Sequence, residues 1–290
     1  MSVSELSGAP QAARRLQKIV NGMPTSDGGG VSLLRVIGTP MLDFIDPFLM
    51  LDEFKNTDPD AYIAGFPDHP HRGFETVSYM KKGRMRHRDS VGNEGVIHDG
   101  GVQWMTAGRG VIHSEMPEQN EGMLWGYQLW VNLPASQKMV EPSYQDIQSD
   151  GIPEITANGL SVRIMAGQYA PAEGPVIDGA SQTRWPVSYM DVMAEPNKAF
   201  THRAADGHNA LIFVYEGCLE IDGQRIDAHQ LAVLGQNGVV SAMAGEEGAG
   251  FLLMTGQPIG EPVAKMGPFV MNTQDELRQA VMDFRAGRFA

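Results

Sequence analysis

The chain has 290 residues, 42% apolar and 20% charged, which is enough for one large globular domain or two of ordinary size. Its formal net charge of −13 opposes binding to nucleic-acid phosphate and to anionic membrane surfaces. The single cysteine, Cys218, excludes a disulfide within the chain. No apolar run predicts a transmembrane helix, and residues 1–10 lack the apolar centre of a secretory signal, so we expect a cytoplasmic protein.

The N-terminal half is predicted to be a β-barrel. Residues 1–30 are expected to form a flexible N-terminal segment, because a run of three glycines ends it. From residue 31 short apolar segments alternate with turn residues, and the aromatic-rich stretch 124–133 is the longest predicted strand. Short strands with glycine-rich turns are typical of a sandwich or barrel. We therefore expect an N-terminal barrel at residues 31–140.

The C-terminal half shows the same alternation of short apolar segments and turn residues, without a strict sequence repeat. Turn signals again separate short apolar segments, and the spacing of the turns predicts a second barrel within residues 141–290. Near the end, Thr273 and Glu276 form a capping box, and Gly287 can terminate the helix that follows. The predicted fold is therefore all-β, with two barrels in tandem and one C-terminal helix packed on the outside of a barrel.

Two short motifs carry the chemistry. In His69-Pro70-His71 the two imidazoles point to one face of a strand, because side chains two residues apart share a face. His113-Ser114-Glu115 repeats this geometry with an imidazole and a carboxylate. Two such strands facing one another inside a barrel would offer three nitrogens and one oxygen to a single metal ion. A lone pair of histidines is a weak signal, and the second motif is what makes a metal site the better interpretation.

The expected ligands are mixed nitrogen and oxygen donors. Such a set suits one divalent transition metal: Fe2+, Mn2+, Ni2+, Cu2+ or Co2+, with Zn2+ also possible although the thiolates of structural zinc sites are missing. Four protein ligands on an octahedral ion leave two positions open for substrate, water or O2.

For several other residues near these motifs, the sequence allows more than one role. Glu75 could be a ligand, could orient an imidazole, or could pair with Arg72. His87 and His98 could orient the metal ligands, but for each we favour a buried histidine that is hydrogen-bonded to the backbone. Four large side chains could line a pocket, but we expect most of them to be core: Trp104, Met105, Trp125 and Trp130.

The run from Lys81 to Arg88 is the one basic cluster on this acidic chain. We interpret it as a solvated hairpin turn. Few aromatic residues interleave with its charges, so it does not predict stacking on nucleic-acid bases.

Three stretches together resemble the pirin family of bicupins. They are HPHRGFETV at residues 69–77, QWMTAGRGVIHSEMP at residues 103–117 and GYQLWVNLP at residues 126–134. The resemblance covers roughly residues 15 to 285, and the middle stretch is the most specific.

The resemblance implies two cupin (jelly-roll) barrels with a single metal, usually iron, in the N-terminal one. The family's metal ligands carry over to His69, His71, His113 and Glu115. Cupins in general place a further glutamate ligand where Glu75 stands, whereas in pirins the carboxylate ligand corresponds to Glu115. The C-terminal half has no His-x-His, as expected of a barrel without a metal.

The family also implies two kinds of function. One is a quercetin 2,3-dioxygenase-like enzyme that opens a flavonol or related aromatic ring with O2. In such an enzyme we expect Glu115 to be both a ligand and the catalytic proton acceptor. The alternative is a redox-sensing regulatory protein that binds a transcription factor or a metabolic enzyme, and the basic run is the feature that would favour such a protein partner. A storage cupin with an incidental metal ranks last. We favour the enzyme, and we expect a monomer.

Overall fold

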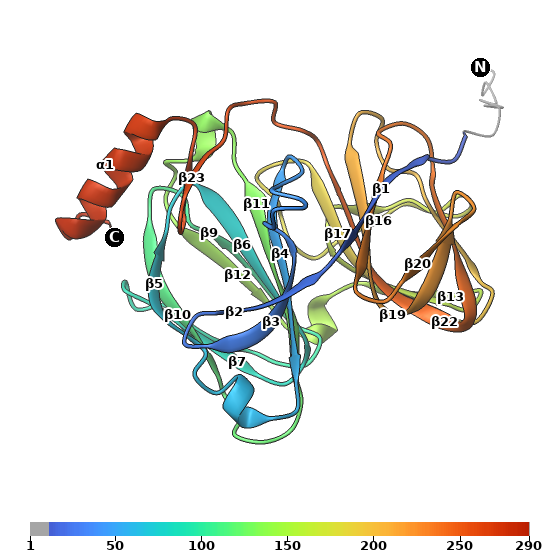
Figure 1. Ribbon diagram of the computed structural model, residues 1–290, viewed down its shortest axis with the longest axis horizontal. Helices are drawn as coiled ribbons and strands as arrows, with labels where there is room; N and C mark the ends of the chain where they lie inside the picture. The colour runs from blue at the N-terminus through green and yellow to red at the C-terminus, as the bar shows by residue number, and fades with distance from the viewer. Residues whose placement is uncertain (1–11, 290) are drawn as a thin grey trace, which may run out of the picture.

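Two β-barrels lie side by side in the computed structural model, which describes residues 12–289 (Figure 1). In the N-terminal barrel a seven-stranded sheet, β12-β9-β6-β11-β4-β3-β2, accompanies a four-stranded sheet, β5-β10-β7-β8. The bounds are β2 (Met23–Asp27), β3 (Val31–Ile37), β4 (Phe48–Asn56), β5 (Phe66–His71), β6 (Phe74–Lys82), β7 (Met85–Asp89), β8 (Glu94–Ile97), β9 (Val102–Thr106), β10 (Val111–Pro117), β11 (Leu124–Asn132) and β12 (Ser143–Ile147).

The C-terminal barrel is built on a nine-stranded sheet with the path β1-β21-β19-β22-β17-β14-β13, to which β18 and β20 add at β22 and β19. The bounds are β1 (Leu16–Asn21), β13 (Glu154–Ala157), β14 (Leu160–Ala166), β17 (Val187–Ala194), β18 (Ala199–His202), β19 (Asn209–Ile221), β20 (Gln224–Asp227), β21 (Gln230–Leu234) and β22 (Val240–Gly256). Two short pairs stand apart: β15 (Gln168–Tyr169) with β16 (Ile177–Asp178), and β23 (Ala264–Met266) with β24 (Phe269–Met271). Three 3-10 turns complete the list: η1 (Pro59–Ala61), η2 (Ala135–Gln137) and η3 (Ser149–Gly151).

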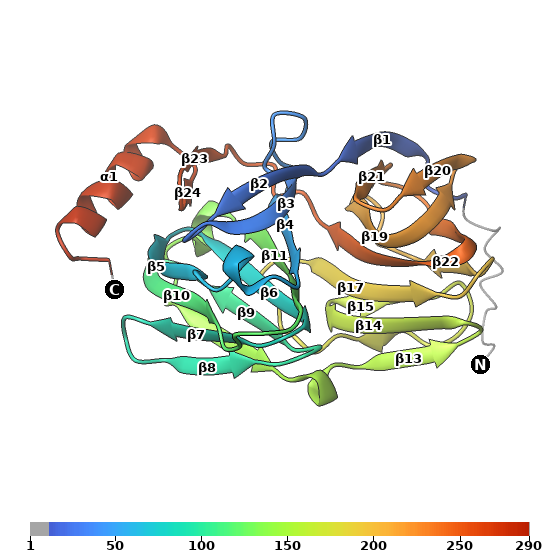
Figure 2. The same ribbon diagram turned by 60° about the horizontal axis from the view of Figure 1, so that its bottom comes forward.

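The two ends of the chain cross between the barrels (Figures 1 and 2). The strand β1 pairs with β21 of the C-terminal barrel, and the chain then passes to β2 in the N-terminal barrel. At the other end, β23, β24 and α1 (Gln274–Arg285) lie beside the N-terminal barrel, and Arg72 forms a bridge to Phe269. Each barrel therefore completes its surface with a segment from the far end of the sequence.

The structure departs from the predicted boundaries at these crossings. Residues 1–11 of the predicted flexible segment lie outside the described residues, but the expectation of flexibility is wrong for residues 16–27, which form β1 and β2. The strand β2 is fully exposed and half of the residues of β1 are exposed, so neither shows the apolar alternation that marks a strand in sequence. The strand β12 pairs with β9, so the N-terminal sheet continues beyond residue 140. The terminal helix falls within the predicted C-terminal domain, residues 141–290, but it lies against the N-terminal barrel.

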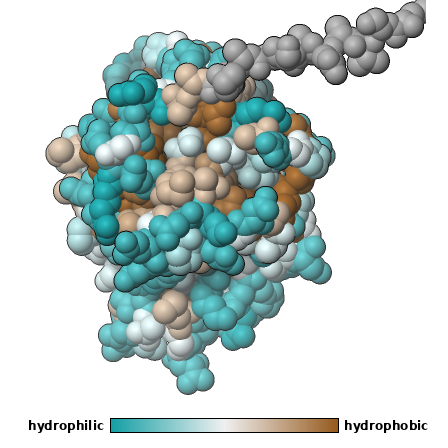
Figure 3. Space-filling view, turned by 90° about the vertical axis from the view of Figure 1, so that its right-hand side faces the viewer, coloured by the Kyte–Doolittle hydropathy of each residue, from teal (hydrophilic) through white to brown (hydrophobic). Residues whose placement is uncertain are grey.

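A shared core joins the barrels. Aromatic rings from both sides meet there, including Tyr127 with Phe213 at 6.3 Å and Tyr79 with Tyr189 at 6.4 Å between ring centroids. A second core of aliphatic and aromatic side chains fills the C-terminal barrel. On the outer face of that barrel, apolar residues are framed by polar ones (Figure 3). No helix among residues 12–289 is long and apolar enough to span a membrane.

The predicted C-terminal helix is confirmed as α1. The Thr273 hydroxyl accepts from the backbone N–H of Glu276, and the Glu276 carboxylate accepts from the backbone N–H of Thr273, which completes the capping box. Gly287, with φ of 66°, follows the helix end. Leu277 and Ala280 are its buried residues, and they pack with the β23–β24 pair. The helix therefore holds this pair against the N-terminal barrel.

Candidate metal centre and substrate pocket

Three predicted ligands come together at one end of the N-terminal barrel. His69 and His71 lie on β5, and His113 lies directly opposite His69 on the antiparallel strand β10. Nε2 of His69 is 2.9 Å from Nε2 of His71 and 3.1 Å from Nε2 of His113. All three ligand atoms lie within 4.8 Å of one another, and no other group of this kind occurs within residues 12–289.

The spacing of these nitrogens fits a metal ion. Two nitrogens bound at about 2.1 Å with a right angle between them are roughly 3.0 Å apart. The tautomer of His69 also fits, because its Nδ1 lies 2.8 Å from the carbonyl of Pro67, which can only accept. The proton is therefore on Nδ1, and Nε2 presents its lone pair to the other imidazoles.

Burial keeps the other two imidazoles neutral. His71 is 3% exposed and His113 is 1% exposed. Burial, followed by the proximity of the neighbouring histidines, lowers the pKa of each well below its ordinary value. Neutral imidazole is the form that binds a metal, so the cluster is ready for one at neutral pH.

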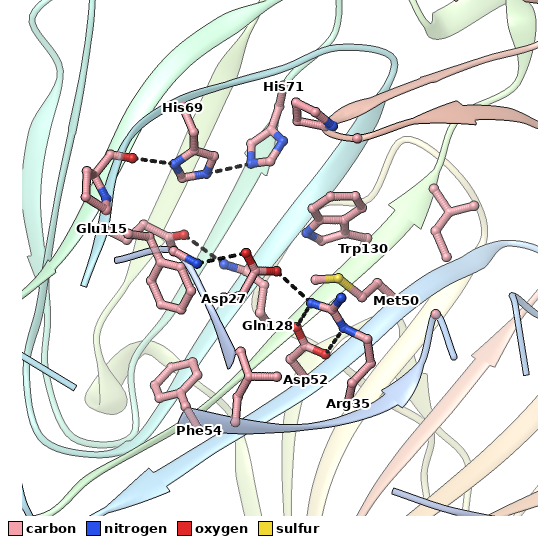
Figure 4. Close-up of a pocket in the computed structure, with 18 of the residues that line it drawn as sticks. Asp27, Arg35, Met50, Asp52, Phe54, His69, His71, Glu115, Gln128 and Trp130 are labelled. Atoms are coloured by element: carbon pink, nitrogen blue, oxygen red, sulfur yellow. Dashed lines mark hydrogen bonds and ion pairs between the residues drawn. The ribbon is translucent and has the colours of Figure 1, made fainter. Parts of the chain in front are cut away.

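Glu115, the fourth predicted ligand, is not part of the close imidazole group but lines the same pocket (Figure 4). The pairing of β10 with β5 shifts register between His113 and Glu115, so Glu115 does not follow His113 in simple side-chain alternation. Its carboxylate is 3% exposed and is held from both sides: Ser78 Oγ donates to Oε1 at 2.5 Å and Gln128 Nε2 donates to Oε2 at 2.8 Å. Each oxygen retains a lone pair for a metal or for a substrate proton.

Glu75 faces away from this site. The strand β5 ends at His71, and the chain turns at Gly73, where φ is 90° and a Cβ would meet the carbonyl oxygen of Val270 at 2.0 Å. This turn breaks the side-chain alternation that would have aligned Glu75 with His69. Instead Glu75 accepts from Thr106 Oγ1 at 2.7 Å, and burial raises its pKa above the ordinary value.

The two further histidines also lie outside the close group. His87 is buried, and its Nε2 lies 3.0 Å from Oδ2 of Asp146, while its ring stacks on Tyr144. It pairs across the sheet with Glu115, so it backs the site from β7. His98 is exposed on the loop after β8. The expectation of buried, backbone-bonded histidines is therefore wrong about the partner of His87, which is a carboxylate, and wrong about His98, which is exposed.

The histidine cluster opens into a pocket of about 660 Å³. Leu49, Met50, Phe54, Phe66 and Trp130 give it apolar walls (Figure 4). Of the four large side chains considered from sequence, only Trp130 lines this pocket, whereas the others are buried core: Trp104, Met105 and Trp125. One side of the pocket comes from the chain's end, with Lys265, Gly267 and Pro268.

A polar cluster, Asp27–Arg35–Asp52, lies in the pocket across from the histidines (Figure 4). Arg35 donates from Nε and Nη2 to the two oxygens of Asp52 at 2.9 and 2.7 Å, and from Nη2 to Asp27 at 2.7 Å. Burial acts against the charge of Asp27, but hydrogen bonds from Arg35 and from the N–H of Gly28 hold its pKa below the ordinary value. No local pattern in the sequence indicates this cluster, because its three residues are scattered over β2, β3 and β4.

The basic run is largely paired within the protein. Lys81 contacts Asp191 at 2.8 Å, Lys82 pairs with Asp99, and Arg86 pairs with both Glu94 and Glu118. The hairpin interpretation agrees with β6 and β7, which flank the turn at Gly83. These intramolecular partners remove most of the free positive charge on which a docking surface would depend.

Two family models match the chain: pirin over residues 30–131 and the pirin C-terminal cupin domain over residues 189–290. A pirin-like protein of Caulobacter vibrioides is 49% identical over 278 residues, covering 95% of this chain and 99% of its own. A crystal structure of quercetin 2,3-dioxygenase from Acinetobacter baumannii superposes with a TM-score of 0.87 at 35% identity, covering 96% of this chain and 99% of that one.

A more distant structure, the Escherichia coli pirin YhhW in complex with nickel(II), has a TM-score of 0.65 at 18% identity and covers 83% of this chain and 99% of that one, so it bears on the fold alone. The extent of the stronger matches, together with two barrels and a histidine cluster in the first, leads to one conclusion. This chain belongs to the pirin family, and its two barrels are cupin domains.

Proposed function

We propose that this protein is a metal-dependent dioxygenase that opens the ring of a flavonol, or a related enolic aromatic, with O2. The observation that carries the proposal is a close cluster of three imidazoles beside an aromatic-walled pocket, which His69, His71 and the hydrogen-bonded carboxylate of Glu115 line. The likeness to a structure described as quercetin 2,3-dioxygenase supports the same choice of substrate class.

In this proposal His69, His71, His113 and Glu115 hold one divalent metal, with iron as the first choice. Imidazole and carboxylate donors also accept other divalent transition metals, so the donor set leaves the choice of metal to experiment. The bound metal would supply Lewis acidity and, if redox-active, a route for electrons between the aromatic substrate and O2.

The protein's own groups bind and orient the substrate. The indole of Trp130 and the side chains of Met50 and Phe54 offer apolar surface to a planar ring. Glu115 can accept the proton of an enolic hydroxyl, because Ser78 and Gln128 hold the carboxylate but leave a lone pair on each oxygen. The low exposure of this carboxylate strengthens such a hydrogen bond by excluding water.

The test begins with protein purified without added metal. Bound metals are measured by plasma mass spectrometry, and quercetin absorbance is then followed under air, with His113→Ala as the control. About one equivalent of a transition metal and quercetin loss in the wild type alone would support the proposal. Metal without quercetin loss would favour the redox-sensing alternative or another substrate. Failure to take up any metal would overturn the metal site. Light scattering on the same sample tests the expected monomer.

A further inference from the structure

We propose that Asp27 and Arg35 form a hydroxyl-recognition site, which selects aromatic substrates that carry a phenolic hydroxyl on the end remote from the metal. This inference rests on the proposed function for its substrate class, but it concerns binding and not turnover. It assigns a role to a cluster that the metal chemistry does not use.

The cluster is placed to contact the far end of a ligand. His69 and His71 lie on one side of the pocket, and the Arg35–Asp52 pair lies on the other, with Asp27 between them in the view of Figure 4. A planar ligand that reaches the imidazoles with one end would lie along the wall formed by Trp130 and would present its other end to this cluster.

The cluster has hydrogen-bonding capacity left over. Asp52 has a side chain only 4% exposed and uses both oxygens on Arg35, so it acts as a fixed anchor. Asp27 has a side chain 55% exposed, and each of its oxygens accepts one hydrogen bond, from Gly28 N–H at 2.8 Å and from Arg35 at 2.7 Å. Nη1 of Arg35 has no hydrogen-bond partner among residues 12–289 (Figure 4).

These open positions match a hydroxyl group. A phenol donates one hydrogen bond, which the carboxylate of Asp27 can accept, and its oxygen can accept from Nη1 of Arg35. A carboxylate on the ligand would fit less well, because two aspartates flank the single guanidinium and a charged oxygen has no proton to offer Asp27. The geometry therefore favours a neutral polyphenol over an aromatic acid.

The test compares three flavonols that differ only in the hydroxyl groups of the pendant ring: galangin without any, kaempferol with one and quercetin with two. Dissociation constants of the metal-loaded protein are measured by titration calorimetry under nitrogen, so that no turnover occurs. The variants are Asp27→Asn and Asp27→Ala, with Asp60→Asn, an exposed carboxylate outside the pocket, as the matched control. Metal content and melting temperature confirm that each variant is folded.

Wild type and Asp60→Asn are expected to bind quercetin about tenfold more tightly than galangin, the factor that one hydrogen bond to a charged group supplies. In both Asp27 variants this preference is expected to fall to within about twofold, while galangin affinity is unchanged. Equal affinity of the wild type for all three ligands, or an unaltered preference in the Asp27 variants, would overturn the inference. If the preference depends on Asp27 but no ligand is consumed under air, the inference stands and the dioxygenase proposal falls. If none of the three binds, both fall.

Discussion

Arg72, the residue that follows His71, donates from Nη1 to Oδ2 of Asp283 in α1 at 2.8 Å. Its guanidinium lies 4.3 Å from the ring centroid of Phe289, and its Nε donates to the carbonyl of Arg109. The last helix is thus fixed to the strand that carries two of the histidines. The helix packs on the β23–β24 pair, and Lys265 of β23 lines the pocket together with Gly267 and Pro268 of the turn that follows it. Helix docking therefore sets the position of one pocket wall.

Replacing Asp283 by Ala should lower the free energy of unfolding by about 1–3 kcal/mol, because the guanidinium of Arg72, whose side chain is 5% exposed, loses its charged partner. Urea denaturation measures the change. The matched control is Asp275→Ala, whose pair with Arg278 is largely exposed and should be worth little. Equal effects of the two substitutions would show that the Arg72 pair does not anchor the helix.

Substitutions of Glu115 and Glu75 should have different effects on the affinity for a divalent metal. Glu115→Gln is expected to weaken the affinity for a divalent metal by at least about tenfold, because a charged ligand becomes a neutral amide. Glu75→Gln should leave the affinity unchanged, since Glu75 is bonded to Thr106 on the other face of the sheet. Competition with a chromogenic chelator gives both values. A loss of affinity in Glu75→Gln alone would reverse the assignment.

His202 should make the stability of the protein depend on pH. Burial lowers its pKa to about 4 from 6.5, and its Nδ1 accepts from the N–H of Ala170 at 3.2 Å. Between these pH values the unfolded chain binds a proton that the folded one does not, so stability falls as pH falls from 6.5 to about 4. The slope per group is about 1.4 kcal/mol per pH unit at most.

The variant His202→Gln should therefore lose less stability than the wild type over that interval. Both proteins are unfolded with urea at several pH values after treatment with a chelator, so that His71 and His113 contribute equally to each. Parallel curves for the two proteins would contradict this account of His202.

Asp191 joins the barrels through a buried polar contact. Tyr79 donates to Oδ2 at 2.6 Å, Lys81 contacts the same oxygen at 2.8 Å, and Tyr215 donates to Oδ1. Asp191→Ala should destabilise the protein by about 3–5 kcal/mol, because it leaves a partly buried ammonium and two phenols without their acceptor. Calorimetric melting should show a drop of several degrees, whereas Asp227→Ala, in an exposed pair with Arg225, should change little. Independent melting of the two barrels in the variant would show that this contact couples them.

Much of the metal site could be predicted from the sequence. Side-chain alternation along a strand places His69 beside His71, because this is a relation between near neighbours. The capping box of α1 is local in the same way, since Thr273 and Glu276 are three residues apart. Each of these patterns depends on backbone geometry within a few residues, so the chain alone specifies it. Alternation does not foresee the register shift between His113 and Glu115, which keeps Glu115 out of the close imidazole group.

The tertiary structure decided the rest. Glu75 is turned away by Gly73, which the carbonyl of Val270 approaches from almost 200 residues further along the chain. The cluster of Asp27, Arg35 and Asp52 exists only because three strands lie side by side in one sheet. The sequence by itself determined which residues could bind a metal, through periodicity. The pairing of distant strands determined what faces the histidine cluster, since such contacts depend on the packing of the whole chain and leave no local pattern.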